Sequence, residues 1–236
     1  SAEELHKFYE TSYYETTEDR SQTDRLEDPD GFYTIQYEDT LRYLNQYVPT
    51  NMPKTILDIG AGYGDFLRFM KKNEWQTRGI EPSKLACDLI KDREALDIRQ
   101  AGIDNLMAAG FSRSTVVALN NVLEHLPEPH KLLAEVKKHL LSTKGLLLMF
   151  VPNEFNAIQD VLNKTALKHN PANQNYWLLP PEHLNYWTMA SFKKFLNNCG
   201  FKVVYSTVDF PMEFFPLMGE DYVSFPEKGR GAHLKR

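Results

Sequence analysis

The sequence predicts an α/β fold: a doubly wound, mostly parallel sheet with helices on both faces. Apolar stretches of strand length alternate with helical patterns between residues 55 and 151, and a glycine-rich turn separates the first strand from the first helix of this series. Parallel neighbours need crossover connections, which are right-handed and usually helical. Such an alternation therefore indicates a parallel sheet that is covered on both faces.

Chain length and composition predict one domain with an appendage. The 236 residues, of which 42% are hydrophobic, can bury one full core. The beginning of the chain is rich in Tyr, Glu, Asp and Thr, and then shows a helical pattern through Tyr37, Leu41 and Leu44. We therefore expect residues 1–50 to form an N-terminal helical cap and residues 51–236 to form the main domain.

The main domain is expected to alternate strands and helices. Each strand is a short apolar run, and each helix repeats its apolar residues every three or four positions. Strands are predicted at residues 55–59, 77–80, 97–99, 115–119 and 146–151. One helix is predicted to begin near residue 65, a second near residue 83, and a third is predicted at residues 129–141.

Beyond Pro152 the alternation stops. The next predicted elements are a helix-like stretch at 154–169, a proline- and aromatic-rich loop at 171–187, a helix at 189–198 that ends at Gly200, and a strand at 202–208. The loop looks like an insertion over a site. We expect lid-like segments near residues 153–187 and, in the C-terminal tail, at 209–236.

Charge and cysteine content limit the partners and the compartment. The formal net charge of −5 offers no basic footprint for a phosphate backbone, so nucleic acid is not expected as a partner. Cys87 and Cys199 indicate neither a disulfide framework nor a metal site, and a cytoplasmic location is expected. No apolar run is long enough for a membrane span, and apolar late segments leave room for a homodimer.

The glycine-rich turn carries the strongest motif, LDIGAGYGDF. It places Asp58 at the end of the first strand and Gly60, Gly62 and Gly64 in the turn before a helix. Glycines let the backbone turn sharply and approach a ligand closely, and the helix that follows offers unpaired N–H groups. About twenty residues later, at the end of the second strand, the Glu81 carboxylate can accept both hydroxyls of a ribose.

A dinucleotide site is disfavoured, and with it a nicotinamide-dependent oxidoreductase. The sequence fingerprint of a dinucleotide site needs a small residue three positions after Gly62. This chain has Asp65 there, beside the place where the pyrophosphate would lie. S-adenosylmethionine has a ribose, no phosphate, and two positive charges, so an acid-rich site suits it.

The motifs together resemble the class I S-adenosylmethionine-dependent methyltransferases, with a Rossmann-like fold, over residues 53–208. Within that superfamily the chain looks most like the ubiquinone-biosynthesis and small-molecule O-methyltransferase group. The stretches that carry the resemblance are LDIGAGYGDF, GIEPS, AGIDNL, LNNVLEHLPEP, the Gly145 turn before LLLMFVPN, and PPEHLNYWT.

The resemblance implies a set of residues that bind S-adenosylmethionine. The glycine turn would line the methionine portion, Glu81 would hold the ribose, and Asn120 would meet the methionine amino group. For Asp104, which would close over the adenine, a helix N-cap is an equal alternative. The complete expected set is Asp58, Gly60, Ala61, Gly62, Gly64, Glu81, Pro82, Ile103, Asp104, Asn120 and Asn121, with Ser83 near the adenine.

Methyl transfer needs an acceptor held near the sulfonium and, for a hydroxyl, a group that removes a proton. The candidate catalytic residues are Glu124, His125 and His183, because they follow strands or lie in the late loop, where ligands bind in open α/β sheets. His125 or His183 is expected as a general base. An alternative is that His125 only orients the loop.

A divalent metal is disfavoured. In some relatives an E-x-x-E-H motif holds a cation that activates the acceptor hydroxyl, but here Asn121 stands at the first acid. The expected function is therefore methyl transfer to a small polar acceptor, by O- or N-methylation of a sugar or other biosynthetic intermediate. The alternative is a methyltransferase-like module that binds S-adenosylmethionine without turnover.

Overall fold

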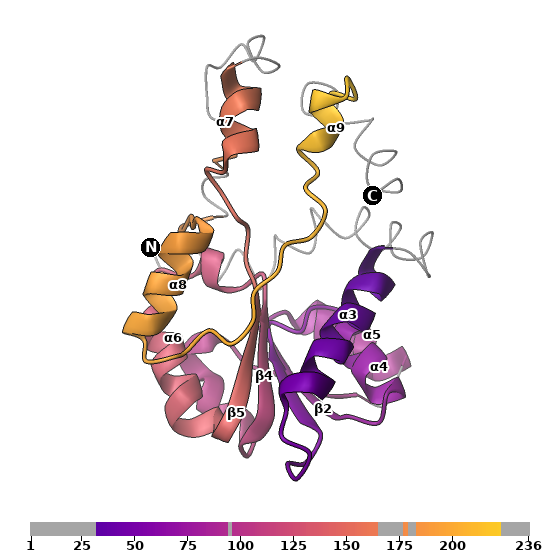
Figure 1. The fold of residues 1–236 in the computed structure, drawn as a ribbon. Helices are drawn as coiled ribbons and strands as arrows, with labels where there is room; N and C mark the ends of the chain where they lie inside the picture. The colour runs from indigo at the N-terminus through magenta and orange to yellow at the C-terminus, as the bar shows by residue number, and fades with distance from the viewer. Residues whose placement is uncertain (1–31, 94–95, 165–176, 179–182, 223–236) are drawn as a thin grey trace.

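A five-stranded, all-parallel sheet forms the centre of the molecule. The computed structural model describes residues 32–93, 96–164, 177–178 and 183–222 (Figure 1). The strands are β1 (Thr55–Ile59), β2 (Gln76–Glu81), β3 (Asp97–Gln100), β4 (Ser114–Asn120) and β5 (Leu141–Phe150), in the order β3-β2-β1-β4-β5. The order reverses at β1, which pairs with both β2 and β4. The predicted doubly wound fold is confirmed.

Helices lie on both sides of the sheet and beyond its carboxyl edge (Figure 1). The first group is α3 (Phe32–Tyr47), α4 (Asp65–Lys72) and α5 (Lys84–Arg93), and the second is α6 (Pro129–Glu135), the π-helical turn η4 (Val136–Leu140) and α8 (Met189–Asn198). Two short 3-10 helices, η2 (Ile103–Ala109) and η3 (Leu123–His125), follow β3 and β4. Beyond the carboxyl edge lie α7 (Ala157–Lys164) and α9 (Phe214–Leu217).

Alternating residues of the central strands build two separate cores. In β4, Val117 and Leu119 pack in a cluster with residues of α6, η4 and α8. Val116 and Ala118 pack instead with residues of α3, α4 and α5. Successive side chains of a strand point to opposite faces, and a strand that is covered on both faces is apolar throughout. This explains why β4 reads as one continuous apolar run.

The helix termini follow local sequence signals. Helix α4 begins directly after Gly64, whose φ is +76°. Helix α8 begins with a capping box, in which the Thr188 side chain accepts from the Ser191 backbone N–H and the Ser191 side chain accepts from the Thr188 backbone N–H. After the last turn of α8, Gly200 has a φ of +76°, as the sequence predicts.

The N-terminal cap is described only in part. Residues 32–47 form α3, which places Tyr37 against Phe66 and Phe69 of α4 at ring-centroid distances of 5.4 and 5.6 Å. The rest of the predicted cap up to residue 31 lies outside the described residues, as do residues 223–236 of the predicted tail segment and parts of the predicted 153–187 lid.

The predicted strand at residues 202–208 is wrong. These residues form no ladder with any described strand, and β5 pairs with β4 alone among the described residues. Instead, the Tyr205 ring lies 4.0 Å from that of Tyr43 in α3, and the Gln36 amide donates to the Asp209 carboxylate at 2.6 Å. Side-chain contacts with α3 therefore replace strand pairing, and a cavity of about 1610 Å³ separates this segment from β5.

The start of β5 also differs from the prediction. The strand begins at Leu141 rather than residue 146, because a register shift lets Leu141 pair with Ser114 before the regular ladder starts at Leu146. Lys144 takes a φ of +64° within this irregular stretch.

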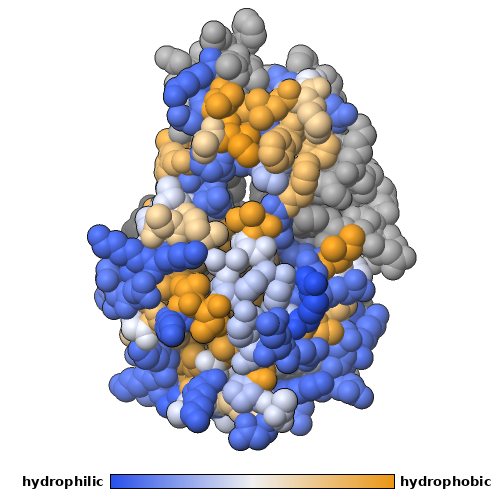
Figure 2. Space-filling model, viewed as in Figure 1, coloured by the Kyte–Doolittle hydropathy of each residue, from blue (hydrophilic) through white to orange (hydrophobic). Residues whose placement is uncertain are grey.

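Apolar side chains gather on the part of the molecule that α7 and α9 form (Figure 2). Val161 of α7 and Phe214 and Leu217 of α9 are exposed there. In the part of the chain that the structure describes, no helix combines the length and apolar character that a membrane span needs.

Candidate functional site

The glycine-rich turn between β1 and α4 packs closely against the loop that follows β4. The backbone N–H groups of Gly60 and Ala61 both donate to the Ile80 carbonyl, at 2.8 and 3.0 Å. Gly60 has a φ of +78°, and a Cβ there would come within 2.7 Å of the Val122 side chain. The turn therefore tolerates only glycine at this position, and it touches the segment that carries the candidate catalytic residues.

Glu81 joins the turns that follow β1 and β2. Its side chain is buried, with 2% of the residue exposed. One carboxylate oxygen accepts from the Gly62 N–H at 2.8 Å and the other from the Ser83 N–H at 2.9 Å. These two hydrogen bonds orient the carboxylate at the carboxyl edge of the sheet, where the sequence predicts a ribose.

The buried Asp58 and the half-buried Asn120 form a second polar pair at the same edge. Burial, and then the nearby Glu81 carboxylate, hold the pKa of Asp58 well above its usual value. The Asn120 amide donates to Asp58 at 3.4 Å, whereas its own buried carbonyl oxygen has no hydrogen-bond partner. An unpaired buried acceptor is costly, so this pair is suited to a positively charged donor such as an ammonium.

The residues predicted near an adenine lie along the ends of β2 and β3. The buried Ser83 hydroxyl accepts from the Ala86 N–H at 3.2 Å and so caps the start of α5. Ile103 and Asp104 are exposed at the start of η2. Gly102 is the N-cap of η2, Asp104 lies in its first turn, and the helix is kinked at Asn105, directly before Leu106, so the N-cap role of Asp104 stays a prediction.

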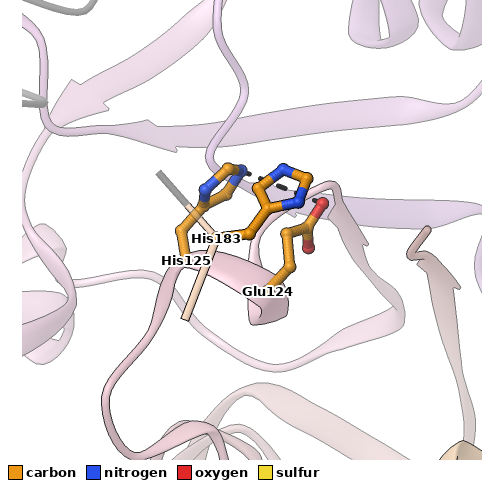
Figure 3. A group of neighbouring side chains, drawn as sticks. All are labelled: Glu124, His125 and His183. Atoms are coloured by element: carbon orange, nitrogen blue, oxygen red, sulfur yellow. Dashed lines mark ion pairs between the residues drawn. The ribbon is translucent and has the colours of Figure 1, made fainter. Parts of the chain in front are cut away.

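Glu124, His125 and His183 converge on one point (Figure 3). Glu124 is 1% exposed and neither of its carboxylate oxygens has a hydrogen-bond partner. Burial raises its pKa to about 7. The His125 Nε2 lies 3.8 Å from a Glu124 oxygen, and the two imidazole rings are 5.0 Å apart. Burial, and then His125, lower the pKa of His183.

The segment that carries His183 is fixed by Asn185, a residue that the sequence analysis did not single out. The backbone N–H groups of Leu184 and Asn185 donate to the Glu124 carbonyl at 2.7 and 3.0 Å. The Asn185 amide donates to the carbonyls of Leu123 and Leu126 at 3.1 and 2.6 Å. These contacts hold the late loop against η3, which is why two histidines 58 positions apart meet. A polar amide inside the aromatic stretch HLNYW was the available signal.

The three converging side chains are chemically able to hold a divalent metal. Their potential ligand atoms lie within 4.8 Å of one another, and one carboxylate with two imidazoles is a known ligand set for zinc and iron. Asn121, the residue that replaces the first acid of the motif, has a φ of +52° and donates its backbone N–H to the Phe150 carbonyl.

Comparison with solved structures supports the fold. The plantazolicin methyltransferase BpumL in complex with SAH is 18% identical, with a TM-score of 0.59 over 96% of this chain and 89% of that chain. An S-adenosylmethionine-dependent methyltransferase from Archaeoglobus fulgidus is 16% identical, with a TM-score of 0.53 over 84% and 90%. A Haloferax volcanii methyltransferase structure, a complex with the Trm112 activator, is 16% identical, with a TM-score of 0.51 over 73% and 74%.

Comparison by sequence decides the family. No curated protein matches the chain. The family described as methyltransferase domain matches residues 33–206, from α3 through η3 to the segment after α8, and so includes every residue of the candidate site. The chain therefore belongs to the methyltransferase domain family.

Proposed function

We propose that this enzyme methylates an oxygen or nitrogen atom of a small polar acceptor. The observation that carries the proposal is the buried carboxylate of Glu124, which has no hydrogen-bond partner and lies beside two histidines. This cluster follows β4 directly, and its neighbour Val122 touches the glycine-rich turn. A group that accepts protons therefore lies next to the turn expected to bind the cofactor.

The buried polar groups at the carboxyl edge match the parts of S-adenosylmethionine. Glu81 would accept the ribose hydroxyls, while Asp58 and the unpaired Asn120 carbonyl oxygen would accept the methionine ammonium. Gly60, Ala61, Gly62 and Gly64 would line the methionine portion without side-chain obstruction. The adenine would lie against Pro82, Ser83, Ile103 and Asp104, and Asn121 would complete the pocket.

The bound cofactor supplies a methyl group on a positively charged sulfur. The cofactor would give up this methyl group to the acceptor atom and keep the electron pair of the broken carbon–sulfur bond, so its product would be S-adenosylhomocysteine. Glu124 takes the proton from the acceptor, directly or through His125 or His183, because its pKa near 7 matches the working pH. The low pKa of His183 keeps its imidazole neutral and able to relay that proton.

A small acceptor agrees with the overall charge. The formal net charge of −5 gives no support for nucleic acid as a substrate. The lid-like roles of residues 153–187 and 209–236, and the cytoplasmic location, remain predictions.

Calorimetric titration tests the cofactor site. We expect wild-type protein to bind S-adenosylhomocysteine at micromolar concentration and to show no binding of NAD. Glu81→Ala should weaken binding of S-adenosylhomocysteine at least tenfold, because the ribose loses its acceptors. Glu38→Ala, which changes an exposed residue of α3, should bind the ligand normally. Binding of NAD alone would contradict the proposal.

Turnover separates an enzyme from a binding module. Acceptors would be screened for S-adenosylhomocysteine release with and without EDTA. We expect release to survive the chelator. Loss of activity in EDTA that Zn²⁺ or Mn²⁺ restores would assign a metal to Glu124, His125 and His183. Release that is unchanged in Glu124→Gln would contradict the role of this carboxylate.

A further inference from the structure

The cavity of about 1610 Å³ beside β5 has mostly apolar walls. One wall is the second half of β5 and the residue after it, 146–151, and the other is the segment 203–210. Val204, Val208 and Phe210 of this segment are exposed although they are apolar. Sites for small organic molecules are typically cavities with apolar walls and a few polar groups at fixed positions. This cavity is therefore suited to a ligand with an apolar body.

Two carboxylates line the cavity beyond the carboxyl end of β5. Glu154 lies just before α7 and Glu213 directly before α9, the two helices beyond the carboxyl edge of the sheet (Figure 1). Both accept from one side-chain amide, because the Gln159 Nε2 donates to Glu154 at 2.9 Å and to Glu213 at 3.0 Å. We call Glu154 and Glu213 the carboxylate pair.

Neutral amides hold the carboxylate pair in position. The Asn156 amide nitrogen donates to the same Glu213 oxygen at 3.2 Å. Its carbonyl oxygen accepts from the Ile158 and Gln159 N–H groups at the start of α7, at 3.0 Å each. The Gln159 carbonyl oxygen accepts from the Phe155 N–H at 2.7 Å. The backbone around the start of α7 therefore orients both amides, and these in turn orient the two acids.

The carboxylate pair has no cationic partner within the described ranges. Glu154 is 8% exposed, and no described lysine, arginine or histidine forms an ion pair with it or with Glu213. In each acid the printed hydrogen bonds involve a single oxygen, so the second oxygen is left for a ligand. Burial raises the pKa of Glu154, the Gln159 hydrogen bond opposes this, and the Glu213 charge adds to it. A cation in the cavity would stabilise both charges.

The other charged residues that line the cavity favour one orientation of a charged ligand. Asp39 pairs with Arg42 at 2.8 Å, and Asp209 accepts from the Gln36 amide at 2.6 Å, so both acids already have partners. Lys137 lines the cavity from η4, which precedes the start of β5. Because like charges repel, a cation is favoured at the end of the cavity that lies beyond the carboxyl end of β5.

We infer that this cavity binds a small amphipathic amine, with its ammonium group on the carboxylate pair and its apolar body between β5 and residues 203–210. An ammonium has three N–H donors, which is enough for the second oxygen of both acids. Hydrogen bonds between two charged groups are stronger than neutral ones. The inference does not depend on the proposed function, because neither Glu124 nor a residue expected to hold the cofactor is among the described residues that line this cavity.

Calorimetry with three probes at pH 7, in the absence of cofactor, tests the inference. Octylamine has a positive charge and an apolar chain, 1-octanol has the same chain without a charge, and methylamine has the charge without the chain. We expect wild-type protein to bind octylamine about tenfold more tightly than either of the other probes. Equal binding of octylamine and 1-octanol, or of octylamine and methylamine, would overturn the inference.

Glu154→Gln and Glu213→Gln test the carboxylate pair itself. Glutamine keeps an oxygen that accepts from the Gln159 amide and removes the charge. Each variant should bind octylamine about tenfold more weakly and 1-octanol as wild type does. Glu38→Gln is the matched control, because it removes an exposed carboxylate of α3 that does not line this cavity. A preference for octylamine that survives in both variants would reject the carboxylate pair as the binding group.

Thermal unfolding and cofactor binding distinguish a binding role of the carboxylate pair from a structural one. Both variants should keep the wild-type melting temperature and the wild-type affinity for S-adenosylhomocysteine. A lower melting temperature together with an equal loss of octylamine and 1-octanol binding would assign the two acids to structure and reject the inference. If wild-type protein fails to bind S-adenosylhomocysteine, the proposed function fails, and the comparison of the three probes still decides this inference.

Discussion

Glu124 is the residue whose surroundings say most about chemistry. A buried carboxylate without hydrogen-bond donors is unfavourable when it is charged. Its pKa is therefore raised from the usual 4.5 to about 7. The group is protonated over a wider pH range in the folded protein than in the unfolded chain, so it stabilises the fold below pH 4.5 and this stabilisation is lost as pH rises through 7.

Replacement of Glu124 by Gln tests this at the level of one residue. We expect the variant to be more stable than wild type at pH 8, by on the order of 3 kcal/mol at most, since each pKa unit corresponds to about 1.4 kcal/mol. At pH 4 the two should unfold alike. Urea denaturation at both pH values measures the difference, with Glu38→Gln as an exposed control. If the difference in free energy of unfolding does not vary with pH, the pKa of the Glu124 carboxylate is not raised.

Helix α8 illustrates how a local signal supports the site at the level of an element. It directly follows the loop that carries His183, and its buried Leu196 belongs to the core beneath the sheet. The segment after β5 is tied to the helix where the Asn153 side chain accepts from the Met189 N–H at 3.1 Å. The start of α8 therefore joins the segment after β5 to the end of the loop that carries His183.

Removal of the α8 N-cap is expected to cost stability. Thr188→Ala breaks the capping box with Ser191, and such losses are typically about 1 kcal/mol. Equilibrium urea unfolding would measure the change, and Thr207→Ala, at an exposed position outside any helix, serves as the comparison. An unchanged free energy of unfolding would mean that tertiary packing alone holds this terminus.

Across the described part of the molecule, the sheet has a buried centre, and β5 is one of its two edge strands. β1 and β4 are buried, whereas most residues of β5 are half-exposed. Its apolar sequence is typical of a strand covered on both faces, yet no described residue pairs with its outer side. An edge of this kind can pair with another chain.

Hydrogen exchange across the protein should reflect this asymmetry. We expect amides of β1 and β4 to exchange most slowly and alternate amides of β5 to exchange much faster, because they face the cavity. Mass spectrometry at two protein concentrations would check this. Protection of β5 only at high concentration would indicate pairing between copies, which is the predicted homodimer. Uniform protection at low concentration would contradict the open edge.

Motifs with a local cause could be predicted from the sequence. The turn with Gly60, the carboxylate of Glu81 at the end of β2 and the end of α8 at Gly200 each depend on neighbouring residues or on the regular alternation of strands and helices. The prediction of a strand at 202–208 was wrong, because a strand needs a neighbouring strand to pair with. The alternating pattern does not indicate whether such a neighbour is present.

The sequence by itself determined the doubly wound fold and the family, because apolar periodicity and glycine spacing act over short stretches of chain. Tertiary structure alone decided that Glu124 is buried without a hydrogen-bond partner and that Asn185 brings His183 to it. Burial and convergence depend on contacts between residues far apart in the chain, and a linear pattern contains no information on the distances between them.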